Sequence, residues 1–182
     1  MRRPLADPGF RYDTGAPWLD LLATVGGAYG PEPVERMRGL PELVEWLDHQ
    51  QLTPQTPPVD ADVDAARELR ELLRPIVVAT VAGEPVPDVA PLQPWLDASA
   101  APRAVVRDGR IALAPPPTAR AALGTLARQA VEFLAEPGHI RLGACADDDC
   151  HMAFLDPAGK RRWCASNVCG VRARVRKHRA KI

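Results

Sequence analysis

The sequence lacks the features that mark membrane proteins, secreted proteins and the common enzyme classes. No apolar run approaches the roughly 20 residues needed to cross a bilayer, and the first eight residues contain no apolar segment typical of a secretory signal. There is no Walker-type loop and no Gly-x-Gly-x-x-Gly, and the four histidines show no pairing with a nucleophile. We therefore expect a soluble cytoplasmic protein with no membrane partner, and an enzyme is the least favoured class.

Two long segments of the chain each lack one kind of residue. Residues 1–144 contain no cysteine, and residues 157–182 contain no aspartate or glutamate. The net charge of the chain is zero, but residues 1–156 carry 14 basic and 23 acidic side chains, whereas residues 157–182 carry nine basic ones. A segment with a net charge of +9 indicates a surface for a polyanion, most simply nucleic acid, although a solvated basic tail would have the same composition.

The 20 prolines divide the rest of the chain. They cluster in residues 54–58, 83–91 and 115–117, which cannot lie inside helices because proline lacks the backbone N–H and clashes with the preceding turn. Between these proline clusters, apolar residues recur at helical spacing. The predicted helices cover residues 18–25 before a turn at Gly26-Gly27, residues 41–52, a segment that starts near residues 60–62, and a segment from Thr118 to a stop at Pro137-Gly138. Pro75 should kink or interrupt the third helix, and Thr118 should cap the fourth.

One segment has the pattern of a β-hairpin. Residues 104–107 and 110–113 are short apolar stretches joined by Asp108-Gly109, a pair that suits the positive φ angles of a type I′ turn. With 182 residues, 46% of them apolar, the chain has enough material for one ordinary domain and a small appendage. The predicted fold class is α+β, with a mainly helical N-terminal domain and a small β-hairpin in residues 1–140, followed by a zinc module in residues 141–182.

The four cysteines predict the metal site of that module. They form two pairs with the same spacing, Cys145-x4-Cys150 and Cys164-x4-Cys169, and thirteen residues separate the pairs. Zinc accepts a tetrahedron of thiolates, and two close pairs can clamp it while the loop between them folds as a hairpin. Two disulfides are the alternative, but they need an oxidising compartment. We expect a structural Zn²⁺ ion, because four thiolates leave no open position for water, and His151 is then only a neighbour.

The segment from Ser166 onward predicts a basic helix. Ser166 or Asn167 can cap it, and an apolar stripe runs along it, formed by Val168, Val171, Val175 and Ile182. The cations predicted to bind nucleic acid are Arg161, Arg162, Arg172, Arg174, Arg176, Lys177, Arg179 and Lys181. Trp163 is expected to pack over the zinc knuckle rather than to stack on a base. The acidic residues 147–149 would repel phosphate, so the contact face should be the helix side.

These residues resemble the CGNR zinc-finger family, whose members carry a treble-clef-like module with four zinc-binding cysteines at the C-terminus. The matching residues are Phe154-Leu155-Asp156, Arg161-Arg162-Trp163-Cys164 and Cys169-Gly170-Val171-Arg172-Ala173-Arg174, in which Val171 replaces the asparagine of the Cys-Gly-Asn-Arg run. In that family the finger usually follows an α/β domain called ABATE, which residues 19–24 and 41–47 resemble. The resemblance implies a stress-induced transcription regulator with a DNA-binding finger and an N-terminal domain that senses a small-molecule effector or dimerises.

The residues leave several partners open. Double-stranded DNA is the predicted partner, which would associate the protein with the nucleoid, but an RNA-binding module would use the same surface. The lack of an aromatic stacking platform near the basic helix favours duplex DNA. A protein-interaction module, in which the valine stripe meets a partner helix, is a third alternative, and the charge bias argues against it. A homodimer would allow two fingers to reach two half-sites.

Overall fold

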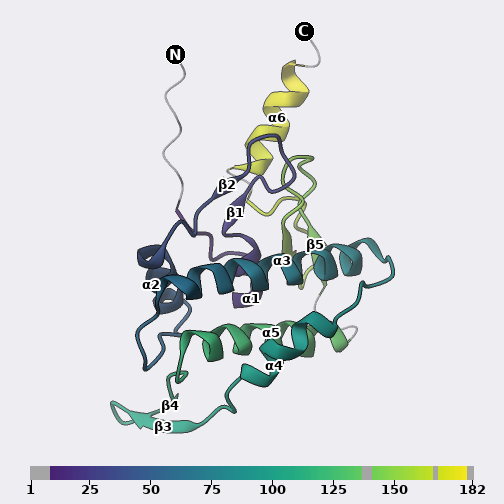
Figure 1. Cartoon of the computed structure of the whole chain (residues 1–182). Coiled ribbons are helices and arrows are strands. Elements are labelled where there is room, and N and C mark those ends of the chain that lie inside the picture. The colour runs from purple at the N-terminus through teal and green to yellow at the C-terminus, as the bar shows by residue number, and fades with distance from the viewer. Residues whose placement is uncertain (1–8, 137–140, 166–167, 180–182) are drawn as a thin grey trace.

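The computed structural model describes residues 9–136, 141–165 and 168–179, and it confirms the predicted α+β class (Figure 1). The helices are α1 (Pro17–Leu22), α2 (Leu40–His49), α3 (Asp60–Ala82), a 3-10 turn (Ala90–Leu92), α4 (Gln93–Ala98), α5 (Ala119–Ala135) and α6 (Cys169–Arg179). The strands form three antiparallel pairs, namely β1 (Val25–Gly26) with β2 (Val34–Glu35), β3 (Ala104–Arg107) with β4 (Arg110–Leu113), and β5 (Leu142–Ala144) with β6 (Ala153–Leu155). Along the described residues, no helix combines the length and the apolar character that a membrane crossing requires.

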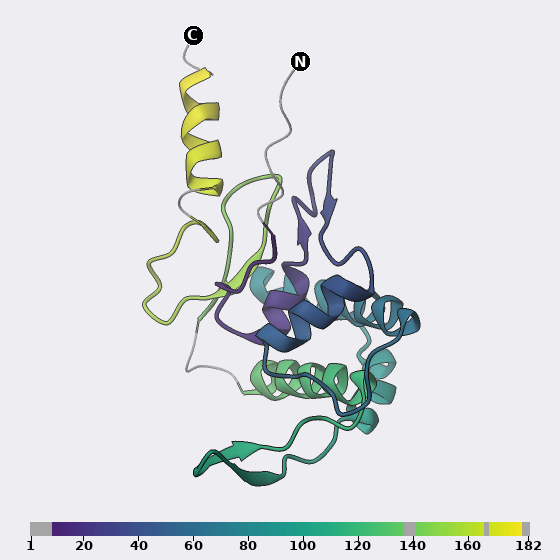
Figure 2. The same ribbon diagram turned by 90° about the vertical axis from the view of Figure 1, so that its left-hand side faces the viewer.

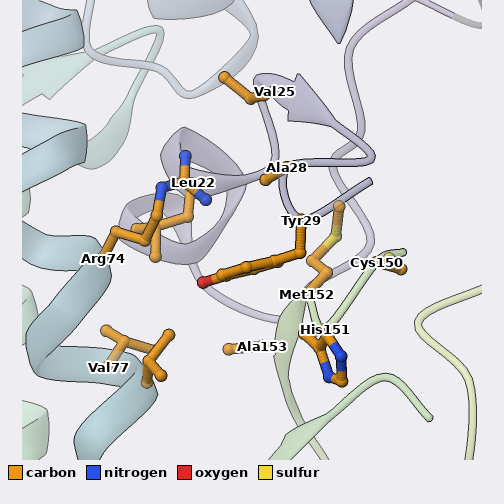
Figure 3. A pocket seen from close by; sticks show the side chains of 11 residues that line it. Leu22, Val25, Ala28, Tyr29, Arg74, Val77, Cys150, His151, Met152 and Ala153 are labelled. Atoms are coloured by element: carbon orange, nitrogen blue, oxygen red, sulfur yellow. The ribbon is translucent and has the colours of Figure 1, made fainter. Parts of the chain in front are cut away.

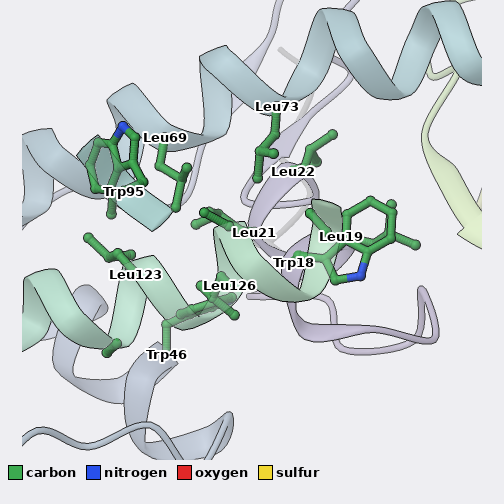
Figure 4. Packing of buried hydrophobic residues seen from close by; sticks show 14 of the residues in the cluster. Trp18, Leu19, Leu21, Leu22, Trp46, Leu69, Leu73, Trp95, Leu123 and Leu126 are labelled. Carbon is green, nitrogen blue, oxygen red and sulfur yellow. The ribbon is translucent and has the colours of Figure 1, made fainter. Parts of the chain in front are cut away.

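The core lies where α3 and α5 enclose the short helix α1 (Figure 4). Helix α1 is buried on nearly every side, as expected for a helix whose residues are mostly apolar. Trp18, Trp46 and Trp95 are each at most 2% exposed. They pack in one cluster with the leucines of α3 and α5, among them Leu69, Leu73, Leu123 and Leu126. These tryptophans stabilise the core.

Helix α3 continues through Pro75 over 23 residues, so the predicted interruption does not occur. Its buried face extends on both sides of the proline, with Leu69 and Leu73 before it and Ile76 and Val77 after it. Proline removes one hydrogen bond from the helix ladder. The burial of this apolar face against α1 and α5 offsets that loss, since tertiary packing contributes more to helix stability than local propensity does.

Helix α5 begins as predicted and makes a close contact with α4. The Thr118 hydroxyl accepts a hydrogen bond from the Ala121 N–H at 3.2 Å, which confirms the predicted cap, and the predicted stop at residues 137–138 lies outside the described residues. A Cβ atom on Gly124 would lie 2.6 Å from the Trp95 carbonyl oxygen and 2.7 Å from the Ser99 nitrogen. Only glycine therefore allows the α4 backbone to approach α5 this closely.

The predicted hairpin is confirmed, whereas two other elements differ from the sequence expectation. Asp108 and Gly109 have φ angles of 52° and 72°, as a type I′ turn requires. Gly26 lies in β1 rather than in the predicted turn, because Val25 and Gly26 pair with β2. A 3-10 turn begins within the end of the second proline cluster, and α4 follows it. Pro91 and Pro94 lie in the first turns of these elements, where the backbone N–H groups have no hydrogen-bond partner within the helix, so the N–H that proline lacks is not needed.

The C-terminal module packs directly on the helical body (Figure 2). Ala153 of β6 belongs to the main core, and Leu142 and Leu155 pack against it. The Leu155 N–H also donates to the Thr14 carbonyl oxygen at 2.7 Å. Gly15, with a φ of 101°, allows this approach, since a Cβ there would lie 2.9 Å from Leu155 Cβ. Strands β5 and β6 thus pack on the core of the helical domain.

Candidate metal centre and nucleic-acid interface

The two cysteine pairs meet where the ends of β5, β6 and α6 converge. Cys145 directly follows β5, and Cys150 precedes β6, so these strands pair across the first knuckle. This differs from the expected hairpin between the two knuckles. Backbone pairing at this position lets the Cys150 N–H donate to the Asp147 carbonyl oxygen at 2.8 Å, which tightens the knuckle. Cys164 lies in the loop after β6, and Cys169 is the first residue of α6.

The four thiols form one buried cluster. Their sulfur atoms all lie within 4.8 Å of one another, with 3.5 Å between those of Cys150 and Cys164 and 3.4 Å between those of Cys164 and Cys169. Each cysteine is at most 5% exposed, and none forms a disulfide, which removes the disulfide alternative. With Zn–S bonds of about 2.3 Å, the sulfurs of a tetrahedral site lie roughly 3.8 Å apart. The cluster therefore has the dimensions and the donor set of a zinc site.

Two arginines donate to the thiol cluster from outside it. Arg11 Nη1 lies 3.1 Å from Cys164 Sγ, and Arg172 Nη2 lies 3.4 Å from Cys169 Sγ. Burial lowers the pKa of Arg11, but the hydrogen bond to Asp13 and the nearby Cys164 raise it above its ordinary value, so the guanidinium keeps its charge.

A small core of its own surrounds the cysteine cluster. Phe154 is fully buried beside the thiols, and Met152 and Trp163 pack against them. Trp163 also lies against the first turn of α6, where a Cβ on Gly170 would be 3.1 Å from Trp163 Cδ1. These contacts confirm the packing role predicted for Trp163. Four buried thiolates leave no open coordination position, so the arrangement suits a structural ion and not metal-bound water chemistry.

The acidic turn, Asp147–Asp149, lies against α6. Arg176 Nη2 is 2.6 Å from Asp147 Oδ1 and 2.8 Å from Asp149 Oδ2. Arg172 Nε is 3.2 Å from Asp147 Oδ2, and the Asp147 side chain has no exposed surface. The acidic run and the helix face, which the sequence predicts to be separate surfaces, are brought together by attraction between their opposite charges. Arg172 and Arg176 therefore hold α6 on the zinc knuckle.

The other predicted cations differ in their surroundings. Arg161 donates to the carbonyl oxygen of Cys164 at 2.7 Å and to that of Asp13 at 3.3 Å, and it lies 4.4 Å from the ring centre of Phe154. Arg161 is itself exposed, as are Arg162, Arg174, Arg176, Lys177 and Arg179. Lys181, Ile182 and the predicted caps Ser166 and Asn167 lie outside the described residues. The predicted valine stripe is solvent-facing, with Val168, Val171 and Val175 between 42% and 43% exposed.

A shallow pocket separates the helical body from the first knuckle (Figure 3). Leu22 and Val77 line it from the body and Met152 from the finger, while the rings of Tyr29 and His151 meet edge to face at 5.5 Å. Its water-sized space is about 20 Å³, room for roughly one water molecule. This pocket is a small gap where the helical body packs on the finger, and it is too small for a metabolite. His151 lines it and is a neighbour of the metal site.

Together these features define a zinc-finger protein in which a helical α+β domain supports a four-cysteine module and a basic helix. Two families match the chain: residues 15–137 match ABATE, described as "Putative stress-induced transcription regulator", and residues 141–181 match the CGNR zinc finger. The chain therefore belongs to the ABATE family, and its C-terminal module is a CGNR zinc finger whose four cysteines form a structural Zn²⁺ site. No curated protein matches the chain.

Proposed function

We propose that the protein is a transcription regulator that binds nucleic acid, with double-stranded DNA as its main partner, through helix α6 of the zinc finger. The observation that carries this proposal is the helix itself. Arg174, Lys177 and Arg179 are exposed on α6, and residues 157–182 contain no acidic side chain. Phosphate binding by such a surface releases counterions from DNA and is favourable at physiological salt.

The internal contacts of the finger support two roles for its cations, one structural and one in binding phosphate. Arg161, Arg172 and Arg176 hold the loop and the helix in place, and Arg172 and Arg176 are already paired with carboxylates. Arg162, Arg174, Lys177 and Arg179, which are exposed, then make the first contacts with phosphate, and Lys181 would extend the same series along the sequence. Arg172 and Arg176 add to the positive potential only to the extent that the acidic turn leaves their charge uncompensated.

The exposed hairpin supports the proposal that the helical domain also dimerises. Val106 and Ile111 are paired across β3 and β4, so their side chains share one face, together with Leu113 two residues further on. They are 78%, 86% and 68% exposed. A two-stranded hairpin is marginally stable alone, and pairing with a second copy would cover this face. Sedimentation velocity should therefore show a dimer of the full-length protein and a monomer of Ile111→Asp, and a monomeric wild type would contradict the proposal.

A comparison of polyanions tests the proposed function. Fluorescence anisotropy of labelled random duplex DNA, duplex RNA and polyglutamate, each titrated with the full-length zinc-loaded protein at low salt, should show the tightest binding to DNA. Equal affinity for polyglutamate, or no binding to either nucleic acid, would contradict the proposal and point to an acidic protein partner. The full chain is needed because removal of residues 145–182 would also remove Ala153 and Leu155 from the core.

A further inference from the structure

The segment before α1 lies between the helical domain and the zinc finger and contacts both. Phe10 and Tyr12 pack against the main core, and the ring of Tyr12 stacks on that of His49 in α2 at 3.4 Å. Arg11, between them, reaches the finger instead. Arg11 precedes the residues that match the ABATE family, and it lies outside the range of the zinc-finger match as well.

Arg11 makes specific contacts with the third cysteine. Its Nη1 donates to Cys164 Sγ at 3.1 Å, and its Nη2 donates to the Cys164 carbonyl oxygen at 3.0 Å. The Asp13 carboxylate holds the guanidinium from the other side, with 2.7 Å between Asp13 Oδ2 and Arg11 Nη2. The Arg11 side chain is only 14% exposed. A planar guanidinium can serve a carboxylate and a thiolate at once, which a lysine ammonium does less well.

The charge of a four-thiolate zinc site explains why such a contact matters. One Zn²⁺ ion with four thiolates carries a net charge of −2, and a buried charge is costly unless opposite charges and hydrogen bonds compensate it. Hydrogen bonds to ligating atoms also orient them, and loss of such outer contacts typically weakens metal binding about 10- to 100-fold. Arg172, in the Arg position of the Cys-Gly-x-Arg run, gives the matching contact to Cys169 from within the finger.

We propose that Arg11 is an outer-sphere residue of the zinc site and that it couples zinc retention by the finger to the folding of the helical domain. It acts through Cys164, so it is a positioning residue and not a metal ligand. Because Phe10 and Tyr12 fix the backbone on both sides of it to the core, Arg11 can reach Cys164 only when the helical domain is folded. Zinc bound by the finger should in turn stabilise the helical domain.

Zinc affinity of the full-length protein, measured by competition with a chromophoric chelator, tests this proposal without reference to nucleic acid. Arg11→Met should bind zinc about 10- to 100-fold more weakly than the wild type. Arg11→Lys keeps the positive charge but loses the planar guanidinium with its several N–H donors, so its zinc affinity should lie between those of Arg11→Met and the wild type. The matched control is Arg103→Met, which removes an exposed arginine of the helical domain and should leave the affinity unchanged.

Thermal unfolding followed by circular dichroism completes the test. Zinc should raise the melting temperature of the helices in the wild type, and it should raise it less in Arg11→Met, because the coupling is lost. This comparison separates an outer-sphere role from general damage, which would lower the melting temperature of both zinc-loaded and zinc-free protein equally. Zinc affinity of Arg11→Met within about twofold of the wild type, with an unchanged zinc-dependent shift in melting temperature, would overturn the proposal.

Discussion

The Cys164→Ser variant should lose both its zinc and its nucleic-acid binding. Cys164 belongs to the thiol cluster, with its sulfur 3.5 Å and 3.4 Å from those of Cys150 and Cys169. A serine hydroxyl is a poor zinc ligand, and zinc binding supplies roughly 10–16 kcal/mol of apparent folding free energy in zinc-finger peptides. We expect zinc content to fall from one ion per chain to a small fraction of that, and DNA affinity to fall about 100-fold or more, as measured by elemental analysis and by anisotropy.

His151→Asn is the matched control for this experiment. His151 adjoins Cys150 and carries a metal-binding side chain, but the four thiols already complete the site. Its φ angle is 44°, and asparagine tolerates this left-handed conformation better than most residues do. His151→Asn should keep one zinc per chain and bind DNA like the wild type. Loss of zinc in this variant would mean that His151 is a ligand. Normal DNA binding by zinc-free Cys164→Ser would separate the metal from the activity.

Simultaneous neutralisation of Arg174, Lys177 and Arg179 by glutamine should weaken DNA binding about 500-fold near 0.1 M salt. Each lost phosphate contact removes the release of roughly 0.9 counterion, so three contacts together contribute a factor of this size. All three side chains are exposed on α6, and no described ion pair depends on them. Zinc content and melting temperature should therefore stay unchanged. Anisotropy titrations at a fixed salt concentration give the ratio of the dissociation constants.

The control for this variant removes the same number of charges elsewhere. Arg103, Arg107 and Arg110 are exposed on or beside the β3–β4 hairpin, at the end of the molecule opposite α6 (Figure 1). Their replacement by glutamine changes the net charge by the same amount but leaves the finger intact. This control should bind DNA within a few-fold of the wild type. An equal loss of affinity in both variants would mean that net charge, and not the surface of α6, determines binding.

The metal site was predictable from the sequence because its chemistry is local. A structural zinc ion needs four ligands, and the two x4 pairs bring all four cysteines into one short segment. The cap at Thr118 and the turn at Asp108-Gly109 were predictable for the same reason, since each depends on a few adjacent residues. The burial of the tryptophans could be predicted from the helical spacing of apolar residues, but that spacing does not indicate which helices pack against one another.

The features that could not be predicted from the sequence depend on contacts between residues that are far apart in the chain. Arg11 lies 153 positions from Cys164, and no local pattern marks it as a neighbour of the zinc site. The acidic turn and Arg176 are 29 residues apart, so their pairing appears only once the finger is folded. Strands β1 and β2, two residues each, are too short to give a periodic signal. Helix α3 continues through Pro75 because tertiary packing, which the sequence does not display, outweighs the lost hydrogen bond.

The most direct test of the central claim is the salt dependence of DNA binding by the zinc-loaded wild type. The logarithm of the association constant should fall linearly with the logarithm of the salt concentration. The slope should be about −3 or steeper, because at least three exposed cations of α6 each release roughly 0.9 counterion on binding phosphate. A slope near zero, or no binding at the lowest salt concentration, would contradict the account of the zinc finger as a nucleic-acid-binding module.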